Sequence, residues 1–435
     1  MIRHAPVLFE KALEVAVEKA KSAGTALGEE IVLVRDLRGR IRPLLPGRYK
    51  DRSPEQRAFG QRLTDALGAY GYPPDRAILY TNDLVQGDQI LVSGDRQLIS
   101  DEDGLKIWLL DRQIIGQDWL RSPLPRETEN PRVTFFGIKG GVGRSTALAI
   151  WAWQLARQGK KVLILDLDLE SPGVSSTLLP ADYLPDYGIV DWFVEDGVGQ
   201  AELVEGLMIA SSPLSRDLPG EIRVSPAFGR DTGDYLPKLA RCYAESSGTA
   251  NGSWAERLQR MVQQMERKER PDLVILDSRA GLHDISAVTV TRMDADAFLF
   301  AVDSVQTWNA YAFLFRHWRH HPQIGEFRQK LQVIAGMVPE TGRDTYLKRF
   351  CENSWDLFRE HLYDEADAQN IDAYSFDLDS LEAPHYPLPI FWNRALQEFD
   401  PLRDDSGIDE QIIEAAMGKF MTEAEIMVFG GKENA

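Results

Sequence analysis

The stretch VTFFGIKGGVGRST, residues 133–146, decides the fold of the longer part of the chain. Residues 133–138 form an apolar run of the kind that makes a buried strand. Three glycines follow, Gly140, Gly141 and Gly143, and Arg144 opens a pattern rich in Ala, Leu and Trp that predicts a helix to about residue 158. Strand, glycine loop and helix in this order gather backbone N–H groups and the positive end of the helix around an anion, so the stretch predicts a phosphate-binding loop.

This loop departs at two positions from the common phosphate-loop pattern G-x-x-x-x-G-K-[ST]. Ile138 stands at the first glycine, Arg144 stands at the lysine, and Lys139 adds a cation inside the loop. The run from Lys139 to Thr146 resembles the deviant Walker A motif K-G-G-x-G-K-[ST] of the ParA- and MinD-like ATPases, in a KGGVGR variant. The resemblance implies that ATP is bound by Gly140, Gly141, Val142, Gly143, Arg144, Ser145, Thr146 and, where this family often contacts adenine, Pro339.

Composition indicates a soluble, globular, cytoplasmic protein of 435 residues. No apolar run approaches the ~20 residues that a membrane-spanning helix needs, and the first residues lack the apolar core of a signal peptide. The two cysteines, Cys242 and Cys351, lie far apart and predict neither a metal site nor a disulfide framework. We therefore expect no membrane association.

The net charge of −18 is unevenly distributed along the chain. Residues 1–130 carry 19 Lys and Arg against 20 Asp and Glu, whereas residues 131–435 carry 30 against 47. The longer part is therefore strongly acidic, which argues against broad non-specific DNA binding there. The basic run Arg35, Arg38, Arg40, Arg42, Arg48, Lys50 and Arg52 offers a possible nucleic-acid contact, although such a run is more often a solvated face.

Two domains are expected, in an α/β architecture: a parallel-sheet P-loop NTPase domain preceded by a small α+β N-terminal domain. Residues 1–120 form the small domain, with predicted helices at 6–22 and 54–69 and predicted strands at 30–34, 77–80 and 106–110. Residues 121–131 are rich in proline and poor in apolar residues, which predicts a linker. Residues 132–435 form the NTPase domain.

In the NTPase domain, predicted strands alternate with predicted helices, which favours a parallel sheet covered on both faces. The strands are expected at 161–165, 273–276, 297–302 and 331–338, and the helices at 253–267, 308–320, 343–362 and 408–427. Residues 181–271 are long and mixed, with turns expected around 211–220 and 246–252.

Carboxylates follow two of the predicted strands directly. Asp166 and Asp168 come after the strand at 162–165, and Asp277 comes after four apolar residues, as in a Walker B site. Strand ends beside a phosphate loop are where Mg²⁺ and the γ-phosphate require such groups. Because Mg²⁺ takes one or two carboxylates and a loop hydroxyl, the predicted metal ligands are Ser145, Asp166 and Asp277.

The family resemblance assigns further roles. It implies that Asp168 orients the attacking water, that Glu170 lies in a first switch segment, and that Ser278 and Arg279 occupy the second switch. ParA proteins usually carry Pro-Pro at the second switch, and Arg279 is equally well explained as a simple ion pair. Lys139 resembles the signature lysine that reaches the nucleotide of a dimer partner, so the predicted catalytic residues are Lys139, Arg144 and Asp168.

The resemblance thus implies an ATP-switched homodimer that uses ATP and Mg²⁺ and signals to an unknown protein partner, in a bacterial partitioning, signalling or defence system. Arg144 keeps the positive charge of the usual lysine but is planar and larger, so slow hydrolysis is expected. The alternative is a nucleic-acid-binding or scaffold module that holds ATP with little turnover.

Overall fold

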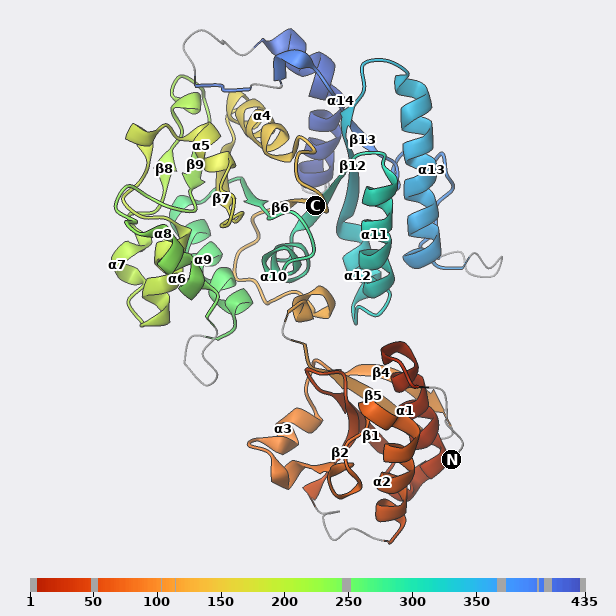
Figure 1. Cartoon of the computed structure of the whole chain (residues 1–435). Helices are drawn as coiled ribbons and strands as arrows, with labels where there is room; N and C mark the ends of the chain where they lie inside the picture. The colour runs from red at the N-terminus through yellow and green to blue at the C-terminus, as the bar shows by residue number, and fades with distance from the viewer. Residues whose placement is uncertain are drawn as a thin grey trace. The chain divides into compact units, whose positions relative to one another are not determined.

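The computed structural model describes residues 6–47, 54–102, 104–113, 115–244, 252–365, 373–396, 399–402 and 409–430. The chain forms two compact units, Met1–Gln117 and Asp118–Ala435 (Figure 1). The basic residues Arg48, Lys50 and Arg52, the turn expected at 246–251 and the predicted start of the last helix at Ile408 lie outside the described residues.

The first unit is built on a five-stranded mixed sheet in the order β3-β2-β1-β5-β4. Strands β1 and β5 are parallel, as are β2 and β3, while β1 with β2 and β4 with β5 are antiparallel. Alternate residues of β1 and β5 pack to opposite faces: one face meets α1 and α2 and the other meets α3. The elements are α1 (Phe9–Ala23), β1 (Glu30–Arg35), β2 (Ile41–Leu45), α2 (Pro54–Leu67), β3 (Leu79–Tyr80), α3 (Gly87–Leu91), β4 (Gln97–Glu102) and β5 (Leu105–Asp111). The expected α+β domain is confirmed.

The boundary between the units lies earlier than the composition indicates, between Gln117 and Asp118. The proline-rich segment 121–131, predicted as a linker, belongs to the second unit. Pro125 accepts hydrogen bonds from the side chains of Gln259 and Gln263, at 2.8 and 3.2 Å. Leu124 N donates to the carbonyl oxygen of Arg292 at 2.9 Å. The segment is therefore held on the second unit by its backbone groups, which composition does not register.

An eight-stranded sheet forms the second unit, in the order β13-β12-β11-β6-β10-β7-β9-β8. All neighbouring strands are parallel except the edge strand β8, which pairs antiparallel with β9. The strands are β6 (Arg132–Gly137), β7 (Lys161–Asp166), β8 (Ala210–Ser211), β9 (Glu221–Ser225), β10 (Leu273–Asp277), β11 (Asp296–Ala301), β12 (Leu331–Val338) and β13 (Leu388–Phe391). The predicted parallel α/β fold is confirmed, with one antiparallel edge.

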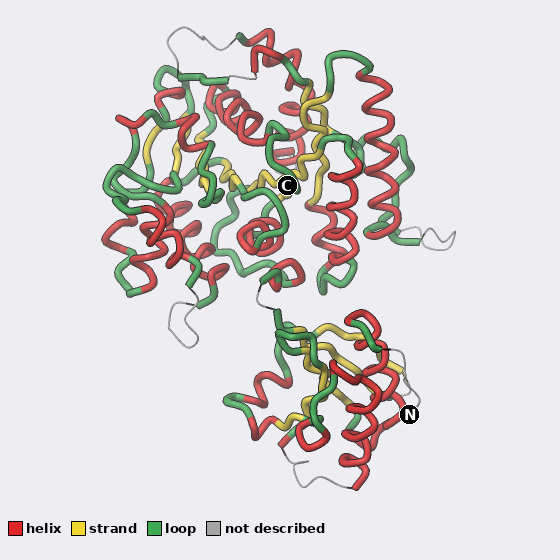
Figure 2. The backbone as a smooth tube through the Cα atoms, in the orientation of Figure 1, coloured by secondary structure: helices red, strands yellow, loops and turns green. Residues whose placement is uncertain are grey.

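Helices cover both faces of this sheet (Figure 2). On one face, alternate residues of the central strands pack with α4 and α14, and on the other they pack with α6, α8 and α9 at one end and with α11 and α13 at the other. The helices are α4 (Arg144–Arg157), α5 (Val174–Leu178), α6 (Ile189–Gly197), α7 (Glu202–Glu205), α8 (Tyr235–Cys242), α9 (Trp254–Glu269), α10 (Asp284–Ala287), α11 (Val305–Trp318), α12 (Ile324–Phe327), α13 (Arg343–His361) and α14 (Glu410–Phe429). No described helix is long and apolar enough to span a bilayer.

Strand β11 begins with a partly buried acid, Asp296. Burial raises the pKa of Asp296 from 3.8 to about 6; Lys330 opposes the shift and Asp294 adds to it. Between these two pH values the folded protein holds a proton that the unfolded chain releases, so stability falls as the pH rises through the window. The cost at neutral pH is on the order of 1–3 kcal/mol.

We expect Asp296→Asn to remove this dependence. Its free energy of unfolding, measured by urea denaturation, should exceed that of the wild type by a margin that grows from pH 4 to pH 6.5 and then stays constant. The matched control is Asp294→Asn, which removes a neighbouring carboxylate bound by Arg126 and Lys330 and should keep most of the slope. A margin that is the same at every pH would contradict the assignment to Asp296.

Candidate nucleotide-binding site

The glycine-rich loop joins the end of β6 to the start of α4. Gly141 and Gly143 have φ values of +73° and +81°, in the left-handed region that glycine adopts without strain. The loop is also pressed against β12, because a Cβ atom on Gly336 would stand 2.3 Å from the carbonyl oxygen of Val142. Backbone geometry therefore explains the glycines at 141 and 143 of the loop, and close packing explains Gly336 on β12.

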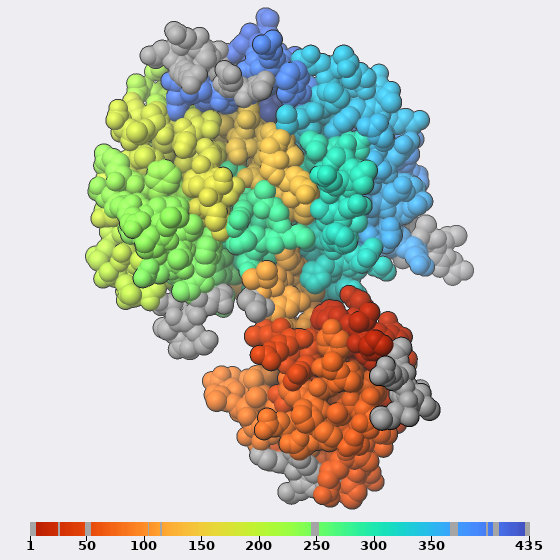
Figure 3. All heavy atoms as spheres, viewed as in Figure 1, coloured from red at the N-terminus to blue at the C-terminus, as the bar shows by residue number. Residues whose placement is uncertain are grey.

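A hollow of about 320 Å³ opens over the loop. It is lined by Lys139, Gly140, Gly141, Val142, Gly143, Arg144, Ser145, Thr146, Asp168, Ser171 and Ala280. The structure therefore brings together all eight predicted loop residues and the predicted water-orienting Asp168. The amber stretch that contains the loop and the start of α4 reaches the surface of the second unit in Figure 3. The N-terminus of α4 has no side-chain cap at Gly143, so its first N–H groups are available to an anion.

Two buried carboxylates stand behind this hollow, at the ends of adjacent strands. Asp277 of β10 lies directly opposite Asp166 of β7 in the parallel register, with Phe135 of β6 on its other side. Both aspartates are almost fully buried. The backbone N–H and the hydroxyl of Ser175 donate to Asp166 Oδ2, while Asp166 Oδ1 has no hydrogen-bond partner.

Arg144 lies among these acids. Its Nε donates to Asp277 Oδ1 at 2.9 Å, and one terminal nitrogen donates to Asp168 Oδ2 at 3.3 Å. The side chain is only 9% exposed. The guanidinium group thus bridges the predicted Walker B acid and the predicted water-orienting acid. Ser145 Oγ is 3.5 Å from Asp277 Oδ2.

The electrostatics of the cluster follow from burial and from this one cation. Burial and, after it, the charge of Asp277 raise the pKa of Asp166 to about 7, against the two hydrogen bonds from Ser175. Burial also raises the pKa values of Asp277 and Asp168, while Arg144 opposes both shifts. Burial works against the charge on Arg144, but Asp277 and Asp168 together raise its pKa. The positive charge of Arg144 therefore offsets part of the negative charge of the neighbouring carboxylates.

This donor set fits Mg²⁺. Asp166 Oδ1 is a buried oxygen without a partner, and Asp277 and the Ser145 hydroxyl lie beside it at the strand ends and the loop. Among the described residues no group of three or more His, Cys, Asp or Glu is arranged to hold a metal by itself. A metal here would therefore need phosphate oxygens as further ligands, as Mg²⁺ sites in phosphate-transfer proteins commonly do.

The two predicted switch segments contact each other. Arg279 and Glu170 form an ion pair, as the interpretation of Arg279 as an ion-pair partner predicts. Tyr243 OH donates to Glu170 Oε1 at 2.7 Å, and Tyr235 OH donates to the carbonyl oxygen of Leu169 at 2.6 Å. The first switch is thus tied both to the second switch and to α8. Ser278 is fully buried and accepts a hydrogen bond from the Thr289 hydroxyl at 2.7 Å.

Some functional contacts carried no sequence signal. Ser175, Tyr235 and Tyr243 fit no motif, and the two tyrosines lie 66 and 73 residues beyond Leu169 and Glu170, which they contact. Pro339 follows β12 but does not line the hollow, so the expected adenine contact is not brought to the loop in this structure. Its neighbour Met337 does approach, since its Cγ would be 3.6 Å from a Cβ on Gly143.

A strand, a glycine loop and a helix, with acids at the two adjacent strand ends, define a P-loop nucleotide-binding domain. Residues 133–340 match the model of the CobQ/CobB/MinD/ParA nucleotide binding domain. Residues 133–340 are thus similar to this nucleotide-binding domain over just under half of the chain, and the family resemblance inferred from the loop is confirmed. The assignment to the KGGVGR variant stays a prediction.

One curated relative carries the name arsenical pump-driving ATPase 2, from Aquifex aeolicus (strain VF5). It is 28% identical over 167 residues, which are 37% of this chain and 50% of that protein. This chain therefore spans only half the length of the relative it matches. The likeness concerns the matched residues, and it does not extend to the relative's whole activity.

Solved structures to which the chain is similar include a ParA family ATPase from Chlorobium tepidum TLS, with 15% identity, a TM-score of 0.37, and coverage of 52% of this chain and 81% of that one. pNOB8 ParA bound to nonspecific DNA has 15% identity, a TM-score of 0.41, and coverage of 70% and 99%. Cobyrinic acid a,c-diamide synthase from Mycobacterium smegmatis, with a bound ATP analog and magnesium, has 16% identity, a TM-score of 0.34, and coverage of 55% and 86%. At these TM-scores the likenesses support no inference about function.

Proposed function

We propose that the protein is a Mg²⁺-dependent ATPase that binds ATP in the hollow over Lys139–Thr146 and acts as a nucleotide-switched homodimer. The observation that carries the proposal is the position of Arg144, between Asp277 and Asp168 at the base of this hollow. A cation already stands among the carboxylates that a phosphate–metal group would use. The family match and the ATPase name of the relative support ATP as the ligand.

Each residue of the site has a definite task in this proposal. Loop N–H groups and the α4 terminus bind the phosphates, and Ser145, Asp277 and Asp166 hold the metal. When bound, Mg²⁺ neutralises the charge that builds up on the phosphate oxygens during transfer. Asp168 lines the hollow and orients the attacking water. Lys139 is exposed on the loop, where it can reach the nucleotide of a second copy.

Hydrolysis is expected to be slow, because Arg144 is hydrogen-bonded to both Asp277 and Asp168. Nucleotide has to draw the guanidinium away from at least one of them before Asp168 can orient water. The ion pair between Glu170 and Arg279 links the two switches, so a change at the γ-phosphate can pass to α8 through Tyr235 and Tyr243.

Such a switch would signal to a partner protein. The partner would bind to the first unit or to the surface formed by the two switch segments. The proposed setting is the bacterial cytoplasm, in a partitioning, signalling or defence system.

An Asp168→Ala protein tests the proposal most directly, because loss of the water-orienting group blocks turnover and traps the ATP state. Light scattering should give a monomer with ADP and Mg²⁺ and a dimer with ATP and Mg²⁺. Asp182→Ala, an exposed acid on the same unit, is the matched control and should dimerise only transiently as ATP is consumed. A chain that binds neither nucleotide, or that stays the same size with both, would exclude the switch.

A second candidate is a scaffold or nucleic-acid-binding module that holds ATP statically. The double ion pair of Arg144 favours it, since a guanidinium that stays on Asp168 would prevent turnover. Phosphate release measured with Mg²⁺, with and without DNA or RNA, discriminates: a scaffold binds ATP at a stoichiometric level and releases no phosphate in any of these mixtures.

A further inference from the structure

The first unit contains a crevice that the ATPase proposal does not use. Strands β1 and β5 are parallel neighbours, labelled side by side in Figure 1, and both end at the same edge of the sheet, at Arg35 and Asp111. After β1 the chain turns back and forms β2, which pairs with β1. Strand β5 is the last strand of this sheet along the chain, so the segment after it does not pair beside β1. In open sheets, a crevice outside the carboxyl ends of parallel strands whose connections diverge is the usual ligand position.

A hollow of about 470 Å³ lies at this edge, within the range of about 300–1,000 Å³ typical of small-molecule sites. Its walls come from the hairpin after β1, from the residues after β5 and from the start of α1. The lining residues are Phe9, Arg35, Asp36, Leu37, Arg38, Gly39, Asp111, Arg112, Gln113 and Ile115, all in the first unit.

The two acids at the floor of the hollow both accept hydrogen bonds. Arg35 pairs with Asp111 through two nitrogens, one of them at 2.9 Å, and its guanidinium carbon stands 4.5 Å from the centre of the Phe9 ring. Asp36 accepts the backbone N–H groups of Arg38 and Arg40 and the hydroxyl of Tyr72. Both carboxylates therefore accept hydrogen bonds, and Asp111 is also paired with the guanidinium group of Arg35.

Two guanidinium groups are not used in this way. Among the described residues, the structure gives neither Arg38 nor Arg112 an ion pair or a side-chain hydrogen bond, yet both line the hollow. The lining carries the three positive charges of Arg35, Arg38 and Arg112 against the two negative charges of Asp36 and Asp111, which leaves a net positive charge of one facing the space. Residues 35–42 contain four arginines and one acid, in a chain whose longer part is strongly acidic, so anions are drawn to this edge.

The remaining wall is apolar and includes an aromatic ring. Phe9, Leu37 and Ile115 are exposed at the hollow. Phe9 is fixed by the hairpin, because a Cβ atom on Gly39, at φ +80°, would meet the ring at 3.0 Å. The Gln113 side-chain amide donates to Asp111 Oδ2 at 3.2 Å, which leaves its carbonyl oxygen available to a ligand N–H group. A flat, partly polar ring and an anion can thus be accommodated together.

We propose that this crevice binds a nucleotide 5′-monophosphate group, with the phosphate on Arg38 and Arg112 and the base along Phe9, Leu37 and Ile115. Arginine forks bind phosphate oxygens in pairs of charge-assisted hydrogen bonds, and bases stack on aromatic and guanidinium planes. The same chemistry has two sources, a free mononucleotide and the 5′-phosphorylated end of a nucleic-acid strand. The first unit would then sense a nucleotide that is not the ATP of the second unit.

The test is fluorescence anisotropy of the full chain with a labelled eight-nucleotide DNA or RNA strand, bearing either a 5′-phosphate or a 5′-hydroxyl. All mixtures contain ADP and Mg²⁺ to fill the loop of the second unit. We expect the 5′-phosphate to strengthen binding by about tenfold or more, and Arg38→Ala/Arg112→Ala to abolish that preference. If only free AMP, GMP, CMP or UMP binds, measured by calorimetry and lost in the same double variant, the free nucleotide is the source.

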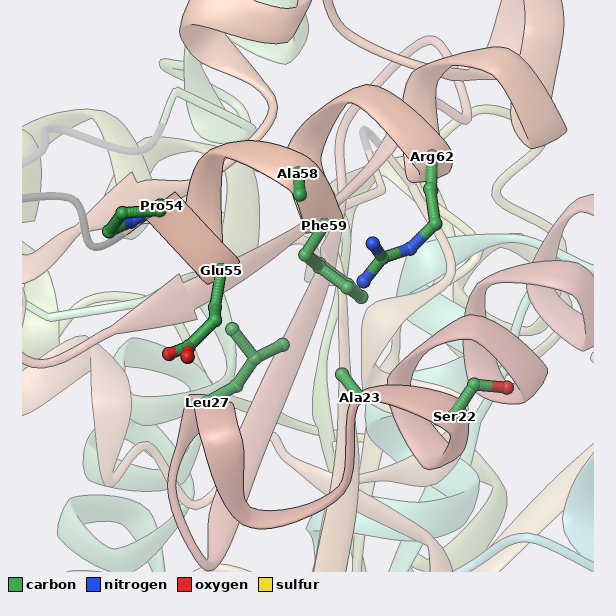
Figure 4. Close-up of a pocket in the computed structure, with 8 residues that line it drawn as sticks. All are labelled: Ser22, Ala23, Leu27, Pro54, Glu55, Ala58, Phe59 and Arg62. Carbon is green, nitrogen blue, oxygen red and sulfur yellow. The ribbon is translucent and has the colours of Figure 1, made fainter.

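The matched control is Arg62→Ala. Arg62 lines a different hollow of the same unit, between α1 and α2, where it and Glu55 stand on either side of Phe59 (Figure 4). Arg62→Ala should keep the 5′-phosphate preference. Equal binding of the two strands with no binding of free nucleotides, or a preference that survives in Arg38→Ala/Arg112→Ala with an unchanged melting temperature, would overturn the proposal. The double variant should still dimerise with ATP, so failure here is distinct from failure of the ATPase proposal.

Discussion

The Lys139→Ala protein should bind ADP and ATP nearly as well as the wild type, yet form no dimer with ATP and lose about a thousandfold in turnover. The reason lies in where the two cations of the loop are held. Arg144 is committed to Asp277 and Asp168 inside its own subunit, whereas the side chain of Lys139 is exposed at the rim of the hollow. A cation supplied by a partner to the transition state is worth about 10³–10⁵ in rate.

The measurements are light scattering and steady-state phosphate release, each over a range of protein concentration. Lys348→Ala, which removes an exposed lysine on α13, is the control and should behave as the wild type. Turnover per molecule should rise with concentration in the wild type and stay flat in Lys139→Ala. If Lys139→Ala dimerises with ATP as the wild type does, the lysine does not act across an interface.

Long apolar runs made most of the second unit predictable. The strands β6, β7, β10, β11 and β12 are mostly buried, and apolar residues dominate their sequences because helices cover both faces of the sheet. The glycine loop and the acids were found for the same reason, since they follow those runs directly. Because β7 and β10 are parallel neighbours in the sheet, their carboxyl ends lie together, and no further sequence signal is needed to place the acids side by side.

The strands that sequence patterns missed are held by their neighbours. Strand β2 carries Arg42 and Pro43 between its apolar residues, so its sequence indicates part of a basic run. The strand nevertheless pairs with β1 over four residues. Strand β13 also contains a proline, Pro389, and lies at the edge of the sheet, where a missing N–H costs little. Local preference indicates loops in both places, and tertiary pairing overrides it.

In the site, the sequence predicts which residues come together but not the contacts that they make. Motif spacing identified Lys139, Asp168 and Asp277 as residues of one site. That Arg144 would bridge two of the acids follows from the burial of Asp277, which forms no other ion pair within the part of the chain that the structure describes. The ties from Tyr235 and Tyr243 to the first switch depend on how residues 181–244 fold over the sheet, which no short pattern encodes.

We expect Arg144→Lys to increase single-turnover ATP hydrolysis by about tenfold or more. The planar guanidinium group of arginine can contact Asp277 and Asp168 at once, whereas the ammonium group of lysine is a compact charge on a shorter side chain. In the lysine variant Asp168 would be free to orient water while the positive charge stays on the phosphates. Rapid-quench measurement of phosphate release, with enzyme in excess over ATP, isolates this step.

Arg144→Ala is the contrasting variant. It leaves Asp277 buried without its counter-ion, which should destabilise the nucleotide-free protein by about 3–5 kcal/mol, and Mg²⁺ should restore part of that loss. The pair of variants separates two roles of one residue: the lysine variant keeps the charge and releases Asp168, and the alanine variant removes both. Fast hydrolysis by isolated wild-type monomer, or an unchanged rate in Arg144→Lys, would show that the guanidinium does not restrain Asp168, and the slow rate would then need a different cause.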